Sequence, residues 1–135
     1  GSRCWSWGFG EYILKVFIVD DDHEVIEVMT AVLENAGHEV ASNVSGARAV
    51  SDIMAMKPDC VIIDLMMAAL DGLELCDEIN RLPNLKKTKI IMVSARDAEH
   101  WKEKAIEHGA VGYITKPIDP AQFASQITAI IDGAA

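Results

Sequence analysis

The sequence is short of several features that define large classes of proteins. Its apolar runs are far shorter than the roughly 20 residues that a membrane-spanning helix needs, so we expect no membrane contact and a cytoplasmic protein. Lysine and arginine number 12 against 21 aspartates and glutamates, which gives a net charge of −9. Because nucleic-acid binding relies on basic side chains, this balance argues against direct binding of nucleic acid.

Cysteine is also scarce, and its spacing fits neither a disulfide framework nor a metal site. We expect free thiols, with Cys60 and Cys76 in the core and Cys4 near the start of the chain. The histidines are scattered without metal-ligand spacing, and we expect them to face solvent: His23, His38, His100 and His108. The sequence therefore offers no nitrogen or sulfur site for a metal.

What is present is the composition of one globular domain. The chain has 135 residues, half of them hydrophobic, which is enough for a single core. Residues 1–12 differ from the rest. Gly1-Ser2 is typical of a cloning remnant, and the following stretch sets Trp5, Trp7 and Phe9 among glycine and serine. We favour an unstructured tail over an aromatic arm that docks on its own domain or on a neighbour.

Short β-branched runs alternate with stretches of helical periodicity. Such runs are typical of buried parallel strands. We expect strands over residues 14–20, 38–44, 60–64, 89–94 and 111–115. We expect helices over residues 23–36, 46–56 and 97–108, a helix that begins at Asp71 and ends before Pro83, and a last helix that opens at Asp119-Pro120.

The helices carry start signals, stop signals and apolar faces. Asp22 and Ser45 are predicted N-caps, and Gly37 and Gly109 are predicted stops. The buried face of the first helix is predicted at Val25, Val28, Met29, Val32 and Ala36, and that of the last helix at Phe123, Ile127 and Ile130. Strict alternation of strand and helix predicts a doubly wound α/β sandwich, with five parallel strands in the flavodoxin-like order 2-1-3-4-5.

Polar residues follow the predicted strands where each strand ends. Asp20-Asp21, Asp64, Ser94 and Lys116-Pro117 each follow an apolar run. Since chemistry in an open parallel sheet gathers beyond the carboxyl ends of the strands, these groups are expected to share one cleft. Three carboxylates raise each other's pKa unless a cation separates them, and Mg²⁺ prefers oxygen ligands. The set therefore suits a divalent metal and a phosphoryl group.

At these residues the chain resembles the receiver domain of two-component response regulators. The resemblance covers about residues 14–131, so we expect a receiver domain over 13–132. It rests on four motifs in order: Asp20-Asp21, Asp64-Leu65-Met66-Met67 with Leu70-Asp71-Gly72, Ser94-Ala95, and Tyr113-Ile114-Thr115-Lys116-Pro117. One residue departs from the pattern, because the family usually has proline where this chain has Ala68. Alanine is expected to loosen the local backbone and to change rates rather than chemistry.

The resemblance implies a role for each matching residue. Asp64 would accept a phosphoryl group from a histidine kinase or a phosphotransfer protein. Asp21, Asp64 and the backbone carbonyl of Met66 would bind Mg²⁺, or Mn²⁺ in its place, and Asp20 would hold a metal-bound water. Lys116 would pair with Asp64 before phosphorylation and with the phosphoryl group afterwards. Ser94 would bond a phosphoryl oxygen, and Ser94 with Tyr113 would form the switch.

Two other functions stay open beside the signalling switch, which would catalyse only its own phosphorylation and dephosphorylation. In a phosphatase with an aspartyl-phosphate intermediate, Asp20 and Asp22 would fill the two catalytic positions, which leaves Asp64 without a role. In a degenerate receiver, the domain would act by docking alone. For the switch, we expect the output face to combine the helix at 97–108, the strand at 111–115 and the last helix. This face would also serve a homodimer.

Overall fold

The computed structural model describes residues 4–5, 12–67, 71–95 and 99–133. Five strands form one parallel sheet in the order β4-β3-β5-β6-β7. They are β3 (Lys15–Val19), β4 (Glu39–Asn43), β5 (Cys60–Asp64), β6 (Lys89–Ser94) and β7 (Gly112–Thr115). In order of sequence this is 2-1-3-4-5, so the predicted fold class is confirmed.

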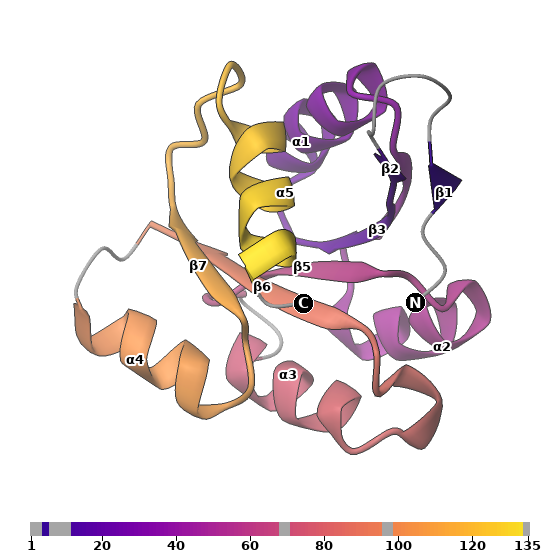
Figure 1. The fold of residues 1–135 in the computed structure, drawn as a ribbon. Helices are drawn as coiled ribbons and strands as arrows, with labels where there is room; N and C mark the ends of the chain where they lie inside the picture. The colour runs from indigo at the N-terminus through magenta and orange to yellow at the C-terminus, as the bar shows by residue number, and fades with distance from the viewer. Residues whose placement is uncertain (1–3, 6–11, 68–70, 96–98, 134–135) are drawn as a thin grey trace.

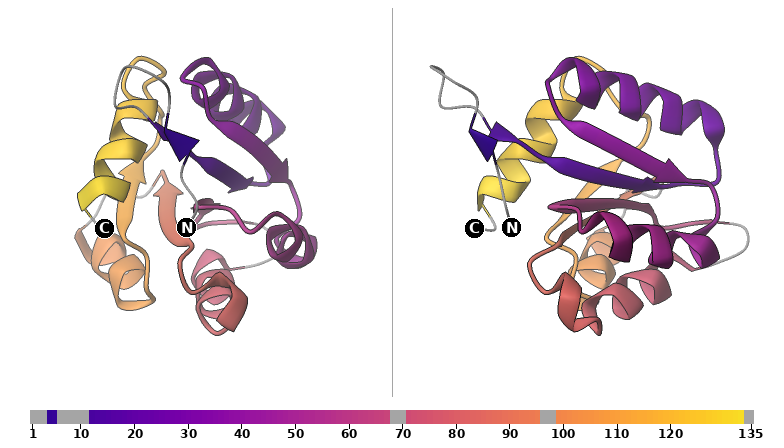
Figure 2. Two further views of the ribbon diagram at one scale, coloured as in Figure 1. Left: turned by 45° about the vertical axis from the view of Figure 1, so that its right-hand side comes forward. Right: turned by 90° about the vertical axis from the view of Figure 1, so that its right-hand side faces the viewer.

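Helices cover both faces of the sheet. They are α1 (His23–Asn35), α2 (Gly46–Met56), α3 (Gly72–Asn80), α4 (Glu99–Glu107) and α5 (Phe123–Gly133), with a short 3-10 helix η1 (Pro83–Leu85) after α3. Helices α1 and α5 lie on one face, and α2, α3 and α4 lie on the other (Figure 1). The two turned views show the sheet between these helical layers (Figure 2).

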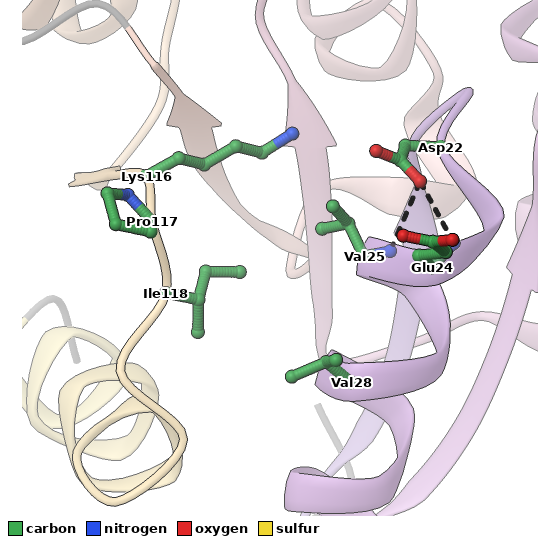
Figure 3. Close-up of a pocket in the computed structure, with 7 residues that line it drawn as sticks. All are labelled: Asp22, Glu24, Val25, Val28, Lys116, Pro117 and Ile118. Atoms are coloured by element: carbon green, nitrogen blue, oxygen red, sulfur yellow. Dashed lines mark hydrogen bonds between the residues drawn. The ribbon is translucent and has the colours of Figure 1, made fainter.

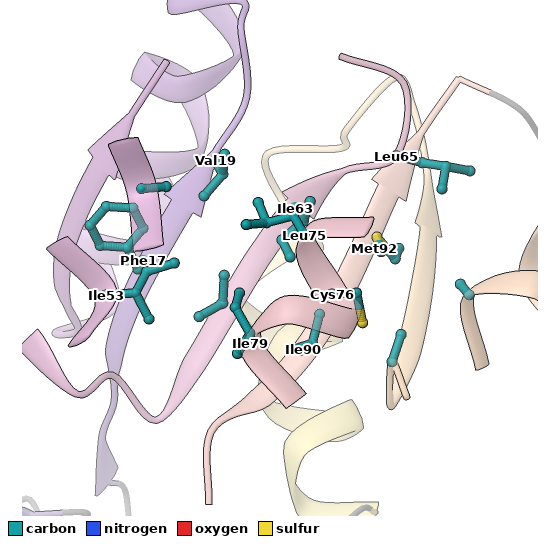
Figure 4. Packing of buried hydrophobic residues seen from close by; sticks show 14 of the residues in the cluster. Phe17, Val19, Ile53, Ile63, Leu65, Leu75, Cys76, Ile79, Ile90 and Met92 are labelled. Carbon is teal, nitrogen blue, oxygen red and sulfur yellow. The ribbon is translucent and has the colours of Figure 1, made fainter. Parts of the chain in front are cut away.

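Alternate side chains of the strands pack into two separate clusters. On β3, Val16 and Ile18 pack with α1 and α5, whereas Phe17 and Val19 pack with α2 and α3. Figure 4 shows the second cluster, in which Ile63 and Met92 of the sheet meet Leu75, Cys76 and Ile79 of α3. Because both faces are covered, the strand residues between Val16 and Val19 are at most 2% exposed. The sheet is therefore buried on both faces and closely packed, and it holds the strand ends in fixed positions.

Most of the helix starts and ends predicted from the sequence are confirmed. Asp22 caps α1 by accepting from the N–H of Glu24 and Val25, and Ser45 caps α2. Gly37 and Gly109 have φ angles of +94° and +101°, which favour glycine after a helix. The start of the last helix was predicted too early. Asp119 accepts from the Ala121 N–H within a turn, and α5 begins only at Phe123.

The predicted buried faces of α1 and α5 are partly wrong. On α1, the buried residues are Ile26, Met29 and Leu33, whereas Val28 is 42% exposed. The helix carries two adjacent apolar stripes. The stripe that faces the sheet is Ile26, Met29 and Leu33, at spacing i, i+3, i+7. On α5 the third buried residue is Ile131 rather than Ile130, which lies at the edge of the same cluster.

The edge of the sheet where β3 begins contains buried polar groups that composition did not predict. Contrary to expectation, His38 is buried, and its Nδ1 accepts from the Leu14 N–H at 3.0 Å. Asp59 Oδ2 accepts from the Lys15 N–H at 2.9 Å. Both side chains satisfy backbone donors at the start of β3, which explains why they are buried despite their polarity.

A second, two-stranded sheet lies before β3 in the sequence. Strand β1 (Cys4–Trp5) pairs antiparallel with β2 (Tyr12–Ile13), immediately before β3. The sequence favoured an unstructured tail, so this pairing is a departure from expectation. No described helix is both long and apolar enough to cross a membrane.

Helix α4 is fastened to α3 at its carboxyl end. The His108 carbonyl accepts from Asn80 Nδ2 at 2.8 Å and from Cys76 Sγ at 3.2 Å. The His108 ring lies 2.8 Å from an Asp77 carboxylate oxygen. Burial, together with the charge of Asp77, raises the pKa of the Cys76 thiol to about 12, so this thiol keeps the proton that it donates. Three side chains of α3 thus hold the end of α4 in place.

Candidate functional site

The parallel sheet brings the carboxyl ends of four strands to one edge. Asp20 directly follows β3, Asp64 ends β5, Ser94 ends β6, and Lys116 follows β7. The register pairs Asp64 with Val93 and Ser94 with Thr115, so these residues are nearly level across the sheet. A backbone bond from the Lys116 N–H to the Ser94 carbonyl, at 2.8 Å, joins the last two strand ends.

The polar residues line a single pocket of about 350 Å³. Its lining consists of Asp20, Asp21, Asp22, Asp64, Met66, Ser94, Ala95 and Lys116. The structure therefore places every residue proposed for metal binding or catalysis around one cavity. Tyr113 is not among the lining residues; it lies on β7, partly buried against the cluster beneath α3 and α4.

Three carboxylates lie close together in this pocket. One oxygen from each of Asp20, Asp21 and Asp64 lies within 4.8 Å of the other two. Asp20 is 1% exposed and Asp64 is 7% exposed, whereas Asp21 is open to solvent. Each buried carboxylate accepts one backbone bond, Asp20 from the Asp22 N–H and Asp64 from the Met66 N–H. These bonds orient both carboxylates but supply only partial positive charge.

Lys116 contributes a full positive charge to the cluster. Its Nζ lies 2.9 Å from Asp20 Oδ2 and 3.5 Å from Asp64 Oδ2. The resemblance implied pairing with Asp64, but the shorter contact is with Asp20, the more deeply buried of the two carboxylates. One ammonium among three ionised carboxylates leaves an excess of two negative charges, which a divalent cation would balance.

The surroundings shift the protonation of both central groups. Burial raises the pKa of Asp64, and the charges of Asp20 and Asp21 raise it further; the Met66 N–H and Lys116 oppose this rise. For Lys116, burial alone lowers the pKa. The hydrogen bond that Lys116 donates to Asp20 and the charges of Asp64 and Asp20 outweigh burial, so the pKa rises and the amine stays an ammonium.

Ser94 and the loop after Asp64 complete the pocket. Ser94 is fully buried at the end of β6, and Met66 is 48% exposed. Met66 also forms an antiparallel bridge with Asp71, which closes the loop between them. The peptide bond between Lys116 and Pro117 is cis, as the sequence allowed. The departure at Ala68 lies outside the described residues.

The donor set fits a hard divalent cation. All side-chain donors in the cluster are carboxylate oxygens, and Mg²⁺ needs only one or two of them because it keeps several waters. Asp21 is the exposed member, so it borders the open side of the pocket. Histidine and cysteine, which favour zinc and copper, are not part of the cluster.

Comparison with known families decides the classification. A model of the response regulator receiver domain matches residues 16–128. The chain belongs to this family. The receiver domain is 31% identical over 117 residues to the alkaline phosphatase synthesis transcriptional regulatory protein PhoP of Bacillus subtilis. It is 34% identical over 119 residues to the heme response regulator HssR of Staphylococcus haemolyticus.

These matches cover 87% and 88% of this chain but 48% and 52% of the relatives. The chain thus spans about half the length of the curated relatives it matches.

Solved structures agree on the fold. The chemotaxis response regulator CheY4 of Vibrio cholerae has a TM-score of 0.82 at 24% identity, covering 87% of this chain and 98% of that one. The activated N-terminal receiver domain of Klebsiella pneumoniae RstA has a TM-score of 0.77 at 28% identity, covering 87% and 97%.

Sequence reasoning missed two members of the pocket. Asp22 was predicted only as a helix cap, and it does cap α1, but it also lines the pocket. Ala95 entered only as a neighbour of Ser94 in its motif. The available signal for both was their place within three residues of a strand end, since β3 ends at Val19 and β6 ends at Ser94.

Mg²⁺ is expected to stabilise the fold by relieving repulsion among the carboxylates. At a concentration 100 times its dissociation constant, a ligand of the native state adds about 2.7 kcal/mol to the free energy of unfolding. Asp21→Asn should remove most of this gain in urea titrations with and without Mg²⁺. Glu34→Gln, an exposed change on α1 with the same loss of charge, is the control and should respond like the wild type. An equal response of both variants would exclude Asp21 as a ligand.

The raised pKa of Asp64 predicts a pH-dependent cost of folding in metal-free buffer. The unfolded carboxyl titrates near its usual pKa of about 3.9, whereas the folded carboxyl titrates higher. Ionisation of Asp64 therefore lowers the free energy of unfolding progressively as pH rises from the pKa of the unfolded state through the higher pKa of the folded state. Asp64→Asn should match the wild type in acid and exceed its free energy of unfolding above this window. A variant less stable than the wild type at neutral pH would contradict the account.

Proposed function

We propose that this receiver domain accepts a phosphoryl group on Asp64, in the presence of Mg²⁺, and that phosphorylation changes an output face. The donor is a histidine kinase or a histidine-containing phosphotransfer protein. The observation that carries the proposal is the contact of one ammonium with two buried carboxylates, beside a third that is exposed. A phosphoryl group that arrives here meets the positive charge of Lys116, which lies 3.5 Å from Asp64 Oδ2.

The residues divide the work of phosphoryl transfer. A carboxylate oxygen of Asp64 attacks phosphorus, an O–P bond forms, and the N–P bond to the donor imidazole breaks. The imidazole nitrogen keeps the electron pair of the broken bond. Lys116 Nζ, now shared by Asp20 and Asp64, pairs with a phosphoryl oxygen, and the Ser94 hydroxyl donates to another.

Asp21, Asp64 and the carbonyl of Met66 are proposed to hold Mg²⁺, with Asp20 beside a metal-bound water. When bound by these residues, Mg²⁺ would supply positive charge that neutralises the phosphoryl oxygens and helps align the reactants. The Met66 N–H keeps the acceptor carboxylate oriented through its bond to Asp64 Oδ1.

A second pocket supports a proposed route of approach for the donor protein. This groove of about 250 Å³ lies between α1 and the segment after β7. Val25, Val28 and Ile118 give it an apolar floor, while Asp22 and Glu24 stand at one end opposite Lys116 (Figure 3). Lys116 lines both cavities, so a side chain of a protein seated in the groove can reach the acceptor pocket.

The proposed output face consists of α4, β7 and α5, and it is also the face proposed for a homodimer. Ser94 ends β6 beside the phosphoryl position, and Tyr113 lies on the neighbouring strand, paired with Met92. Movement of the Ser94 hydroxyl toward a phosphoryl oxygen opens space that the Tyr113 ring can fill. Because α3 fastens the end of α4 at His108, this rearrangement is expected to move the opposite end of α4.

The phosphatase alternative is weakened by the role of Asp22. Its Oδ1 accepts from the backbone N–H groups of Glu24 and Val25, so the residue that would fill the second catalytic position is engaged as a helix cap. That alternative also leaves Asp64 without a task, although Asp64 contacts Lys116.

Incubation with acetyl phosphate and Mg²⁺ tests the acceptor. Intact mass should show one phosphoryl adduct on the wild type and none on Asp64→Asn. Asp52→Asn, an exposed change on α2, is the control and should be phosphorylated fully. An adduct retained by Asp64→Asn would refute the assignment, and a wild type without any adduct would favour the docking module.

Hydrogen exchange with and without beryllofluoride and Mg²⁺ tests the output face. We expect changed protection around Asp20 and Asp64, and also in β7 and in the first turns of α4. The segment around His108 should change least, because α3 holds it. Changes confined to the loops around the two aspartates would show that this face is not the output.

A further inference from the structure

Gly72, the first residue of α3, packs against the backbone of the phosphoacceptor strand. A Cβ built on this glycine would lie 2.6 Å from the Asp64 carbonyl oxygen and 2.8 Å from Leu65 Cα. Both neighbours are backbone atoms, so no side-chain rotation can relieve the contact. Real Cβ atoms essentially never approach so closely. Glycine is therefore required here by space.

This close approach closes the loop that carries Met66. The Gly72 N–H donates to the Leu65 carbonyl at 3.1 Å, and Met66 bridges Asp71 in antiparallel fashion. Within the closed loop, the Met66 N–H holds Asp64 Oδ1 at 3.1 Å. The contact at Gly72 thus lies at the base of the loop that orients the acceptor carboxylate.

Neither side of this contact is free to yield. On the strand side, Leu65 N–H donates to the Val93 carbonyl at 3.0 Å, which ties the end of β5 to β6. On the helix side, Leu75, Cys76 and Ile79 are fully buried against the sheet. Because both partners are anchored, a displacement forced at Gly72 must be absorbed by the backbone between Asp64 and Met66.

We propose that Gly72 is a positioning residue for phosphoryl transfer. Its missing side chain lets α3 begin against Asp64 and Leu65, which sets the Met66 N–H and carbonyl relative to the Asp64 carboxylate. The inference rests on the proposed function, because it assigns Gly72 to the same site. It goes further by giving the start of α3 a role in metal affinity and in transfer rate, beyond its role in packing.

The test compares Gly72→Ala with Gly112→Ala. A Cβ on Gly112 would lie 2.6 Å from Ile130 Cγ2, so this control also forces a methyl group into a tight contact, here between β7 and α5. Gly112 pairs with Ile91 near the start of β7, at the edge remote from the pocket. Both variants are measured at a temperature where circular dichroism shows them folded.

Gly72→Ala should weaken Mn²⁺ binding, measured by electron paramagnetic resonance, by at least tenfold. It should slow phosphorylation by acetyl phosphate by a similar factor. Gly112→Ala should lose stability but keep both quantities within twofold of the wild type. If Gly72→Ala binds Mn²⁺ like the wild type, the inference is wrong. It is also wrong if Gly72→Ala loses no more Mn²⁺ affinity and phosphorylation rate than Gly112→Ala does.

The role of Gly72 can still be tested if the wild type is not phosphorylated, or if Gly72→Ala does not fold. If the wild type takes up no phosphoryl group, the proposed function fails, while Mn²⁺ affinity still tests Gly72. If Gly72→Ala does not fold, amide exchange of the wild type replaces it. The N–H groups of Gly72 and Met66 should then slow together when Mg²⁺ binds, and protection of Gly72 alone would overturn the inference.

Discussion

The contact of the Lys116 ammonium with Asp20 and Asp64 is the interaction on which the site depends. Two carboxylates that are almost completely buried would be costly without it, because an unpaired charge in a dry interior is strongly destabilising. Even so, one ammonium does not balance the cluster, because Asp21 adds a third carboxylate. The cluster therefore keeps more negative than positive charge, and this excess favours the binding of a cation.

The sheet supplies the geometry that this balance requires. Four strand ends at one edge place groups from distant parts of the chain side by side, and two hydrophobic clusters fix the strands from both faces. Loops then refine the arrangement. The bond from Met66 to Asp64 sets one carboxylate, and the close approach at Gly72 closes the loop that makes this bond. At the other end of the molecule, the contacts of α3 with His108 restrict where α4 can move.

The sequence was sufficient to predict the fold and most of the residues around the pocket, because both follow from local patterns. Apolar runs that end in polar residues predict buried strands and one functional edge, as at Ile63-Asp64 and Val93-Ser94. Properties that depend on tertiary packing were not predictable. The face that α1 buries, the burial of His38 beneath Leu14, and the preference of Lys116 for Asp20 over Asp64 all arise from contacts between distant segments. The pairing of β1 with β2 lacked a strand pattern strong enough to predict it.

A crystal structure with Mg²⁺ and beryllofluoride would test the central claim most directly. The account predicts Mg²⁺ in contact with Asp21, Asp64 and the Met66 carbonyl, and beryllofluoride on an Asp64 oxygen. Lys116 Nζ should have left its 2.9 Å contact with Asp20 Oδ2 for a fluorine atom. Lys116 still bonded to Asp20, with no ion between the carboxylates, would contradict the account.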